Sequence, residues 1–382
     1  MSPVELPDKC TGPLVAIGRA CGKLYLAGEY AVVDPGGMAL LAGVDRYVSV
    51  SAYHVDSPVG RIFSRYYPSE GRTFSISGQS RAGNRRIISS DWDRRDIVAA
   101  ALEMAYAVVT DRGQVPQVLD LVIESGLDDE ASGRKYGLGS SAAVNVAVID
   151  AVLQAHECHV SRLELFQAAY LAATLSGQSG SGGDLASASH GGVVRYRRPE
   201  LAHKPSPDCG DDLQPWAALV GTEWPNLELE HREDLPGLQL AAGWTGQPAS
   251  TEAQLKRTEA TQPIDSKEAF ITQAAEVVQR LWQTWQDEPK EILDTWRSEF
   301  ARFRELLAQY GQLKGITIET KQLATLTNIA LEFSAAAKSS GAGGGDCGIA
   351  LLPEEQSLIE LHHAWQAADI IPLPVNLAQL NP

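Results

Sequence analysis

The sequence predicts an α+β protein with two domains. In the first half, β-rich runs such as "LYLAGEYAVV" alternate with alanine-rich helical runs such as "RDIVAAALEMAYAVVT". A Pro- and Asp-rich stretch, "LAHKPSPDCGDDLQP", then precedes a second set of strands and helices. We therefore expect a first domain over residues 1–210 and a second over residues 211–382.

The elements of the first domain follow from the spacing of apolar residues. Short β-rich runs predict strands over residues 24–33, 45–55, 118–125 and 191–198. Alanine-rich runs with helical spacing predict helices over residues 95–110, 142–156 and 161–175. The last of these helices begins with a capping box, because Ser161 is followed three residues later by Glu164.

The same signals predict the elements of the second domain. Strands are expected over residues 216–221, 238–246 and 347–353. Long helices are expected between about residues 250 and 310, and a further helix over residues 322–340. No internal repeat or low-complexity segment interrupts this order.

Charge and cysteine content argue against several classes of partner. The 382 residues carry a formal net charge of −16, whereas nucleic acids and anionic membranes require a basic face. The five cysteines are scattered and form no C-x-x-C motif, which is typical of reduced thiols in a cytoplasm. The sequence shows neither a signal-peptide pattern nor an apolar run of membrane-spanning length. We expect a cytoplasmic protein with neither a nucleic acid nor a membrane as its partner.

A glycine- and serine-rich loop precedes one of the predicted helices. In "KYGLGSSAAVNVAVIDAVL" (135–153), Gly137, Gly139, Ser140 and Ser141 come directly before the apolar run. Glycine lets the backbone approach a ligand closely, and a helix N-terminus offers free N–H groups and a partial positive charge. These features predict an anion site, most simply for a phosphate. An ordinary capped helix is the alternative that this stretch alone leaves open.

The common nucleotide-binding patterns do not account for this loop. The chain has no G-x-x-x-x-G-K-[ST] motif, which excludes a P-loop protein. "GGGDCG" (343–348) matches G-x-G-x-x-G, but it follows a predicted helix and precedes a strand, the reverse of a Rossmann turn. The triplets H-R-D and D-F-G are absent, which excludes a protein-kinase fold. A phosphate site in some other fold remains.

Three motifs resemble those of the GHMP small-molecule kinases, which include galactokinase, homoserine kinase and mevalonate kinase. "GKLYLAGEYAVV" resembles the N-terminal motif of the family, "GLGSSAA" its phosphate-binding motif and "SGAGGGDCGIAL" its C-terminal glycine motif. The three occur in the order found in the family and cover both halves of the chain. The resemblance implies the two-domain GHMP-kinase fold, with the ATP loop in the first domain and the active site in the interdomain cleft.

Within this family, the motifs look like those of the phosphomevalonate kinases, including "GSGGDLA" and "GWTGQPAST". That implies transfer of the ATP γ-phosphoryl group to (R)-5-phosphomevalonate, giving (R)-5-diphosphomevalonate and ADP in the mevalonate route to isopentenyl diphosphate. Mevalonate kinase or another GHMP small-molecule kinase is the alternative activity. A non-catalytic ligand sensor with this fold is the alternative of another class, and the presence of both Lys23 and Asp184 disfavours it.

The resemblance also implies roles for single residues. Lys23 would bridge the donor and acceptor phosphates, and Asp184 would act as a catalytic base or position Lys23 or the metal. The ATP phosphates would bind Gly137, Leu138, Gly139, Ser140, Ser141 and Ala142, and Ser141 would also hold Mg²⁺, whose second ligand stays open. The expected substrate-binding residues are Glu29, Tyr30, Ser181, Gly182, Gly183, Ser250, Thr251, Ser339, Gly341, Ala342, Gly343 and Gly344.

Overall fold

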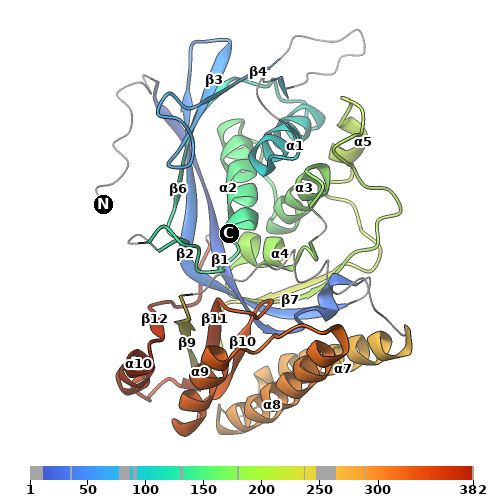
Figure 1. The fold of residues 1–382 in the computed structure, drawn as a ribbon. Helices are drawn as coiled ribbons and strands as arrows, with labels where there is room; N and C mark the ends of the chain where they lie inside the picture. Colours follow the sequence, from blue (N-terminus) through green and yellow to red (C-terminus); the bar gives the residue numbers. More distant parts are fainter. Residues whose placement is uncertain are drawn as a thin grey trace.

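Two β-sheets with their helices make up the described part of the protein, one above the other in Figure 1. The structure is a computed structural model, and it describes residues 12–34, 37–76, 87–88, 93–129, 132–178, 180–235, 237–246, 264–287 and 289–380. Both sheets carry helices packed on them, so the predicted α+β class is confirmed.

The first sheet is built around one long central strand, β2. In the described residues its strands are β1 (Leu14–Ala27), β2 (Met38–His54), β3 (Val59–Ser64), β4 (Arg72–Ile76), β5 (Ile87–Ile88), β6 (Leu119–Ser125), β7 (Val193–Arg197) and β8 (Glu228–Arg232). Their order is β5-β4-β3-β6-β2-β7-β8, and β1 pairs with β2 in antiparallel fashion. The pairing of β3 with β6 is parallel, while the other pairings are antiparallel.

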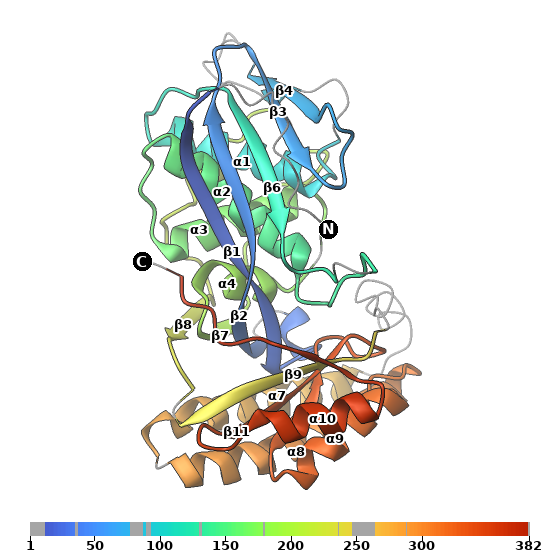
Figure 2. The ribbon, with the colours of Figure 1, turned by 90° about the vertical axis from the view of Figure 1, so that its left-hand side faces the viewer.

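Among the described helices, those of the first half cover one face of this sheet and leave its other face open. They are α1 (Ile97–Asp111), α2 (Ser140–Ala155), α3 (Arg162–Leu175) and α4 (Gly183–His190), with the short α5 (Gln214–Ala217) beside α1. Figure 2 shows the open face toward the viewer, with α1, α2 and α3 behind it. The predicted capping box at Ser161 and Glu164 is confirmed, since each residue's side chain accepts the other's backbone N–H.

The second sheet has the strand order β10-β11-β9-β12. Its strands are β9 (Leu238–Trp244), β10 (Ala336–Ser340), β11 (Cys347–Pro353) and β12 (Ile371–Leu373). The helices of this half are α7 (Ile264–Gln283), α8 (Pro289–Lys314), α9 (Lys321–Glu332) and α10 (Leu358–Ala367). The neighbouring residues Ala336 and Ala337 of β10 belong to separate apolar clusters, the second of which also holds Trp365 of α10. The two faces of the sheet are therefore both covered.

Two of the predicted elements in this half are wrong. The strand predicted over residues 216–221 lies instead in the last residues of α5 and the turn that follows it. The helix predicted over residues 322–340 ends at Glu332, and the remaining residues form β10. Ser334 has a φ of 59°, so the chain leaves the helix through a left-handed residue before the strand. The alanines of this stretch suit a helix, but pairing with β11 decides their conformation.

The chain crosses between the two halves more than once. Strand β8 belongs to the first sheet, and the first sheet therefore includes residues up to Arg232. The domain boundary predicted between residues 210 and 211 stays a prediction. The last residues then return to the first sheet, where the Ala378 N–H donates to the Gly43 carbonyl at 2.8 Å and Leu377 bridges Val44. The C-terminus therefore lies beside the first half in both views (Figure 2). Among the described helices, none has the length and apolar character needed to cross a bilayer.

Candidate functional site

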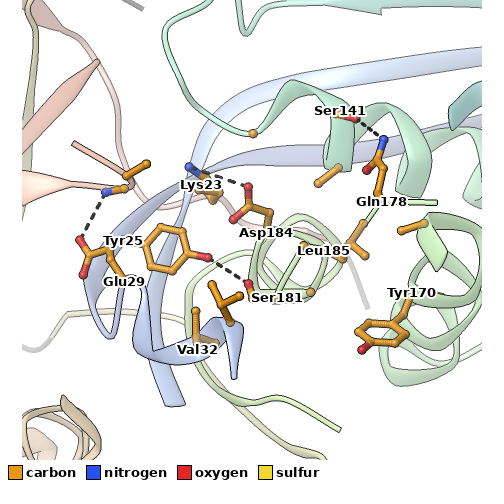
Figure 3. Close-up of a pocket in the computed structure, with 18 of the residues that line it drawn as sticks. Lys23, Tyr25, Glu29, Val32, Ser141, Tyr170, Gln178, Ser181, Asp184 and Leu185 are labelled. Atoms are coloured by element: carbon orange, nitrogen blue, oxygen red, sulfur yellow. Dashed lines mark hydrogen bonds and ion pairs between the residues drawn. The ribbon is translucent and has the colours of Figure 1, made fainter. Parts of the chain in front are cut away.

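A cavity lies where the end of β1, the N-termini of α2 and α4, and the loop between β10 and β11 meet (Figure 3). Its lining residues come from both halves of the chain. They are Lys23, Tyr25, Glu29, Tyr30, Val32, Val33, Gly139, Ser141, Ala142, Tyr170, Ala173, Thr174, Gln178, Gly180, Ser181, Gly182, Asp184, Leu185, Gly341 and Ala342. The location between the halves agrees with the expected interdomain site.

The glycine-rich loop brings its backbone against the cavity through left-handed residues. Gly137 has a φ of 80° and Gly139 a φ of 79°, and Gly139 is the N-cap of α2. None of the described side chains caps the α2 N-terminus, so its first N–H groups stay available for a ligand. A Cβ atom on Gly139 would lie 3.1 Å from Cγ of Lys23. The capped-helix alternative therefore accounts for the loop less well than an anion site does.

The serines of this loop differ in position. Ser141 lines the cavity, and its hydroxyl accepts a hydrogen bond from Nε2 of Gln178 at 3.3 Å. Ser140 is not among the lining residues of the described cavity, nor are Gly137 and Leu138. Leu138 contributes through its carbonyl, which accepts the backbone N–H of Lys23 at 2.9 Å. That contact ties the loop to β1.

Lys23 holds its ammonium group between the glycine loop and α4. Its Nζ donates to the Gly137 carbonyl at 3.0 Å and lies 3.9 Å from Oδ2 of Asp184. The residue is 8% exposed, which is unusual for lysine and is explained by these partners. The sequence-predicted pair Lys23 and Asp184 is thus brought together, as Figure 3 shows.

Asp184 stands in the first turn of α4. Gly182, with a φ of 87°, is the N-cap of this helix, so the carboxylate lies near the positive end of the helix dipole. The side chain is 39% exposed toward the cavity. Two helix N-termini, those of α2 and α4, therefore point at the same space as the Lys23 ammonium.

Tyr25 is a residue of the site that the sequence analysis missed. Its hydroxyl lies 3.4 Å from Oγ of Ser181, and the Lys23 ammonium lies 5.2 Å from its ring centroid. Burial, followed by the nearby Asp184 carboxylate, raises the pKa of Tyr25 well above its ordinary value. The sequence offered one signal for Tyr25, its position two residues after Lys23, because residues i and i+2 of a strand point to the same face.

The turn after β1 contacts the β10–β11 loop through side chains. The Glu29 carboxylate forms an ion pair with Lys338, and its Oε1 also accepts the Gly341 N–H at 3.3 Å. The hydroxyl of Tyr30 donates to the Ala342 carbonyl at 2.5 Å. Tyr30 itself has a φ of 63°. These contacts close the cavity on the side of the second sheet.

The remaining substrate-binding predictions fall into separate groups. Ser181, Gly182, Gly341 and Ala342 line the cavity together with Glu29 and Tyr30. Of the residues in the described chain, Gly183, Ser339, Gly343 and Gly344 do not line it. Ser250 and Thr251 lie outside the described residues.

The positions of this second group have structural explanations. A Cβ atom on Gly183 would lie 3.0 Å from the Tyr25 hydroxyl. Gly343 packs on the backbone of Ile318, whose carbonyl accepts the Gly344 N–H at 2.7 Å. Ser339 is 1% exposed within β10. The contacts of Ser339, Gly343 and Gly344 therefore hold β10 and the β10–β11 loop in place, independently of any contact with a ligand.

An apolar wall of the cavity also escaped the sequence analysis. Its members belong to the turn after β1 and to α3 and α4, and they are Val32, Val33, Tyr170, Ala173 and Leu185. Tyr170, Ala173 and Leu185 lie on helices, where the local sequence does not distinguish them from ordinary core positions. Val32 and Val33 belong to the end of the strand predicted over residues 24–33, and that part of the prediction is wrong, because β1 ends at Ala27 and Ala31–Val33 form a short 3-10 helix.

A metal ion would depend on few protein oxygens here. No group of three or more His, Cys, Asp or Glu residues that could hold a metal occurs in the described part of the chain. Mg²⁺ in phosphoryl-transfer sites typically takes one or two protein oxygens, with phosphates and water completing its shell. Asp184 and Ser141, both at the cavity, supply such oxygens, so the donor set fits that mode of binding.

Comparisons with known proteins agree with the family that the sequence motifs predict. The model of the GHMP kinases N-terminal domain matches residues 96–192, and that of the GHMP kinases C-terminal domain matches residues 294–370. Phosphomevalonate kinase of Streptomyces sp. (strain CL190) is 34% identical, with 96% of this chain and 98% of that protein covered. Mevalonate kinase of Pyrococcus abyssi (strain GE5 / Orsay) is 25% identical, with 90% of each chain covered.

A solved structure gives the same result in three dimensions. Streptococcus pneumoniae phosphomevalonate kinase in complex with phosphomevalonate and AMPPNP superposes with a TM-score of 0.74 and 25% identity, covering 95% of this chain and 99% of that one. The predicted GHMP-kinase fold is confirmed by this likeness and by the two domain matches. The chain therefore belongs to the GHMP kinase family, and phosphomevalonate kinases of that family match it over nearly its full length.

Proposed function

We propose that this protein transfers the γ-phosphoryl group of ATP to the phosphate of 5-phosphomevalonate, giving ADP and 5-diphosphomevalonate. The observation that carries the proposal is the meeting of Lys23, Asp184 and the α2 N-terminus at one cavity, in a chain 34% identical to a phosphomevalonate kinase. The product belongs to the mevalonate route to isopentenyl diphosphate.

The reaction brings two polyanions together, so the protein must supply positive charge in a fixed position. The N–H groups at the start of α2, next to Gly139, offer a site for the ATP phosphates. The Lys23 ammonium stands 3.0 Å from the Gly137 carbonyl of the same loop, where it can contact both the transferred group and the acceptor. Such pre-positioned charge stabilises the transition state without reorganisation during the reaction.

Asp184 is assigned to positioning rather than to proton removal. The second pKa of a phosphate monoester is about 6, so the acceptor oxygen is already mostly ionised at neutral pH. The Asp184 carboxylate, 3.9 Å from Lys23, orients the ammonium instead. With a hydroxyl acceptor such as mevalonate, the same carboxylate would be needed as a general base.

Magnesium is part of the proposal. Ser141 and Asp184 are the residues that would hold it, at the cavity edge where the ATP phosphates bind. The chemistry that Mg²⁺ would supply there is positive charge to offset the negative charge of the phosphate groups. A cytoplasmic location is also proposed, and the described cysteines, Cys21, Cys158, Cys209 and Cys347, support it because all four are free thiols.

The proposal is tested by a coupled ADP-release assay with ATP and Mg²⁺ against phosphomevalonate, mevalonate, homoserine and galactose. We expect turnover with phosphomevalonate and at least tenfold lower kcat/KM, about 1.4 kcal/mol, for the others. Turnover with mevalonate but not phosphomevalonate would contradict the assigned acceptor and leave the kinase class intact. ATP binding without turnover of any acceptor would favour a ligand sensor.

A further inference from the structure

A buried carboxylate forms part of the wall of the cavity in which the proposed function places an anionic acceptor. Glu29 lines the cavity, yet its side chain is only 2% exposed. Its Oε1 is engaged by Lys338 and the Gly341 N–H, and its Oε2 has no hydrogen-bond partner among the described residues. Left uncompensated, this negative charge would repel a phosphorylated, carboxylate-bearing substrate.

Lys338 compensates that charge from behind the wall. Its side chain is 0% exposed and does not line the cavity. The ammonium pairs with Glu29, donates to the Ser339 carbonyl and lies 5.4 Å from the ring centroid of Phe303. Burial lowers the pKa of Lys338, and the Glu29 carboxylate opposes that shift.

The balance of charge around the cavity depends on this pair. Among the described lining residues the charged side chains are Lys23, Glu29 and Asp184. Without Lys338, two carboxylates would face one ammonium. With Lys338, the Glu29 charge is cancelled, and the Lys23 ammonium keeps its attraction for an anion.

We propose that Lys338 is a positioning residue that neutralises Glu29 and so allows the cavity to accept an anionic acceptor. Lys338 acts through Glu29 and does not touch the substrate. This inference rests on the proposed function, because an uncharged acceptor would not need the compensation. A purely structural pair is the competing explanation, since both side chains also hold the residues Ser339–Gly341.

The two explanations can be told apart because the two single variants leave different charges in the cavity wall. Lys338→Met leaves the Glu29 carboxylate alone, whereas Glu29→Gln leaves no negative charge in the wall. For the Glu29 carboxylate and one negative charge on an acceptor about 10 Å away, we apply Coulomb's law with an effective dielectric constant of about 20. The repulsion then corresponds to a change of more than tenfold in the dissociation constant of the acceptor. A structural pair would instead be broken equally by either variant.

The experiment measures KM for phosphomevalonate and thermal unfolding for Lys338→Met, Glu29→Gln and the double variant. We expect KM to be about tenfold higher in Lys338→Met than in Glu29→Gln, and close to the parent value in the double variant. Lys338→Gln, which keeps a hydrogen-bond donor but loses the charge, should raise KM like Lys338→Met and covers the case where that variant does not fold.

A matched control removes a cation from another buried carboxylate. Arg280 lies 2.8 Å from Glu299, whose side chain is 5% exposed, and neither residue lines the cavity. Arg280→Met should lower the melting temperature and leave KM at the parent value. Equal KM values in Lys338→Met and Glu29→Gln would overturn the inference alone. Absence of phosphomevalonate turnover by the parent protein would overturn the proposed function and the inference with it.

Discussion

Lys23 takes its position from neighbours that belong to three separate segments. The glycine loop supplies the Gly137 carbonyl, α4 supplies the Asp184 carboxylate, and Tyr25 of the same strand supplies a ring below the ammonium. A lysine held in this way has lost most of its side-chain freedom before a ligand arrives, so its charge acts without an ordering cost at the time of reaction.

Removing this charge should impair the reaction more than removing the carboxylate beside it. Lys23→Met removes the charge that we propose stabilises the transition state, and loss of such a contact typically costs about 3 kcal/mol, or ~100-fold in kcat. Asp184→Asn keeps the shape and should lose less, because the acceptor phosphate is already ionised. The measurement is kcat for both variants between pH 6 and 9. A larger loss in Asp184→Asn, with disappearance of an acidic limb present in the parent, would make Asp184 a general base.

The close approach at Gly139 gives a second prediction at the same scale. Gly139→Val places a branched side chain at a φ of 79° and about 3.1 Å from Lys23. We expect ATP affinity to fall about tenfold or more while the circular dichroism spectrum stays native, since strain at one left-handed residue costs only about 1–3 kcal/mol. Gly133→Val is the control, with a φ of 68° and nothing within 4 Å of the added Cβ. Equal ATP affinity in the two variants would mean that the glycine loop only begins α2 and does not bind the ATP phosphates.

At the scale of elements, α4 carries the candidate site residue Asp184 at one end and a buried titratable group at the other. Asp184 stands in its first turn, while His190 stands in its last, where Nδ1 lies 3.1 Å from the Ala186 carbonyl. Burial lowers the pKa of His190 from 6.5 to about 4, and the nearby His231 and Arg162 act in the same direction. The helix that positions Asp184 thus requires a neutral imidazole.

That requirement predicts a loss of stability on acidification. The unfolded chain binds a proton on His190 below about pH 6.5, whereas the folded protein does so only near pH 4. The contribution of the neutral His190 to the free energy of unfolding should therefore be complete above pH 6.5. It should fall by at most about 3 kcal/mol as the pH drops from 6.5 to 4. His190→Gln should flatten this part of the profile in urea unfolding between pH 4 and 8. An unchanged slope would assign the loss to other groups, such as His156 and His231.

At the scale of the whole molecule, the C-terminal segment fastens the second half to the first. Ala378 donates to the Gly43 carbonyl and its own carbonyl accepts the Gly192 N–H, each at 2.8 Å. Asn376 adds side-chain and backbone contacts to Asp45. Gly43 is the β2 residue opposite Lys23, so this segment also supports the strand that carries the site.

Breaking that attachment should loosen the molecule as a unit. Ala378→Pro removes the N–H and leaves the Gly43 carbonyl without its donor, at a cost of about 1–3 kcal/mol. We expect a lower melting temperature and faster amide hydrogen exchange along β1 and β2. Asn376→Ala, whose contacts are solvent-exposed, is the milder comparison. Parental exchange rates in Ala378→Pro would mean that the segment only covers the sheet.

The sequence by itself determined the class of the fold, the capping box at Ser161 and the glycine loop before α2, because each depends on local residue types and their spacing. Lys23 and Asp184 became candidates through the resemblance of their motifs to a known family, and the structure brought the two side chains together. Only the tertiary structure decided that residues 336–340 form a strand and that Tyr25 shares the site with Ser181. It also decided that Glu29 meets Lys338, 309 positions away. Contacts of this kind depend on how two sheets pack, and no local pattern along the chain encodes the partner of a buried charge.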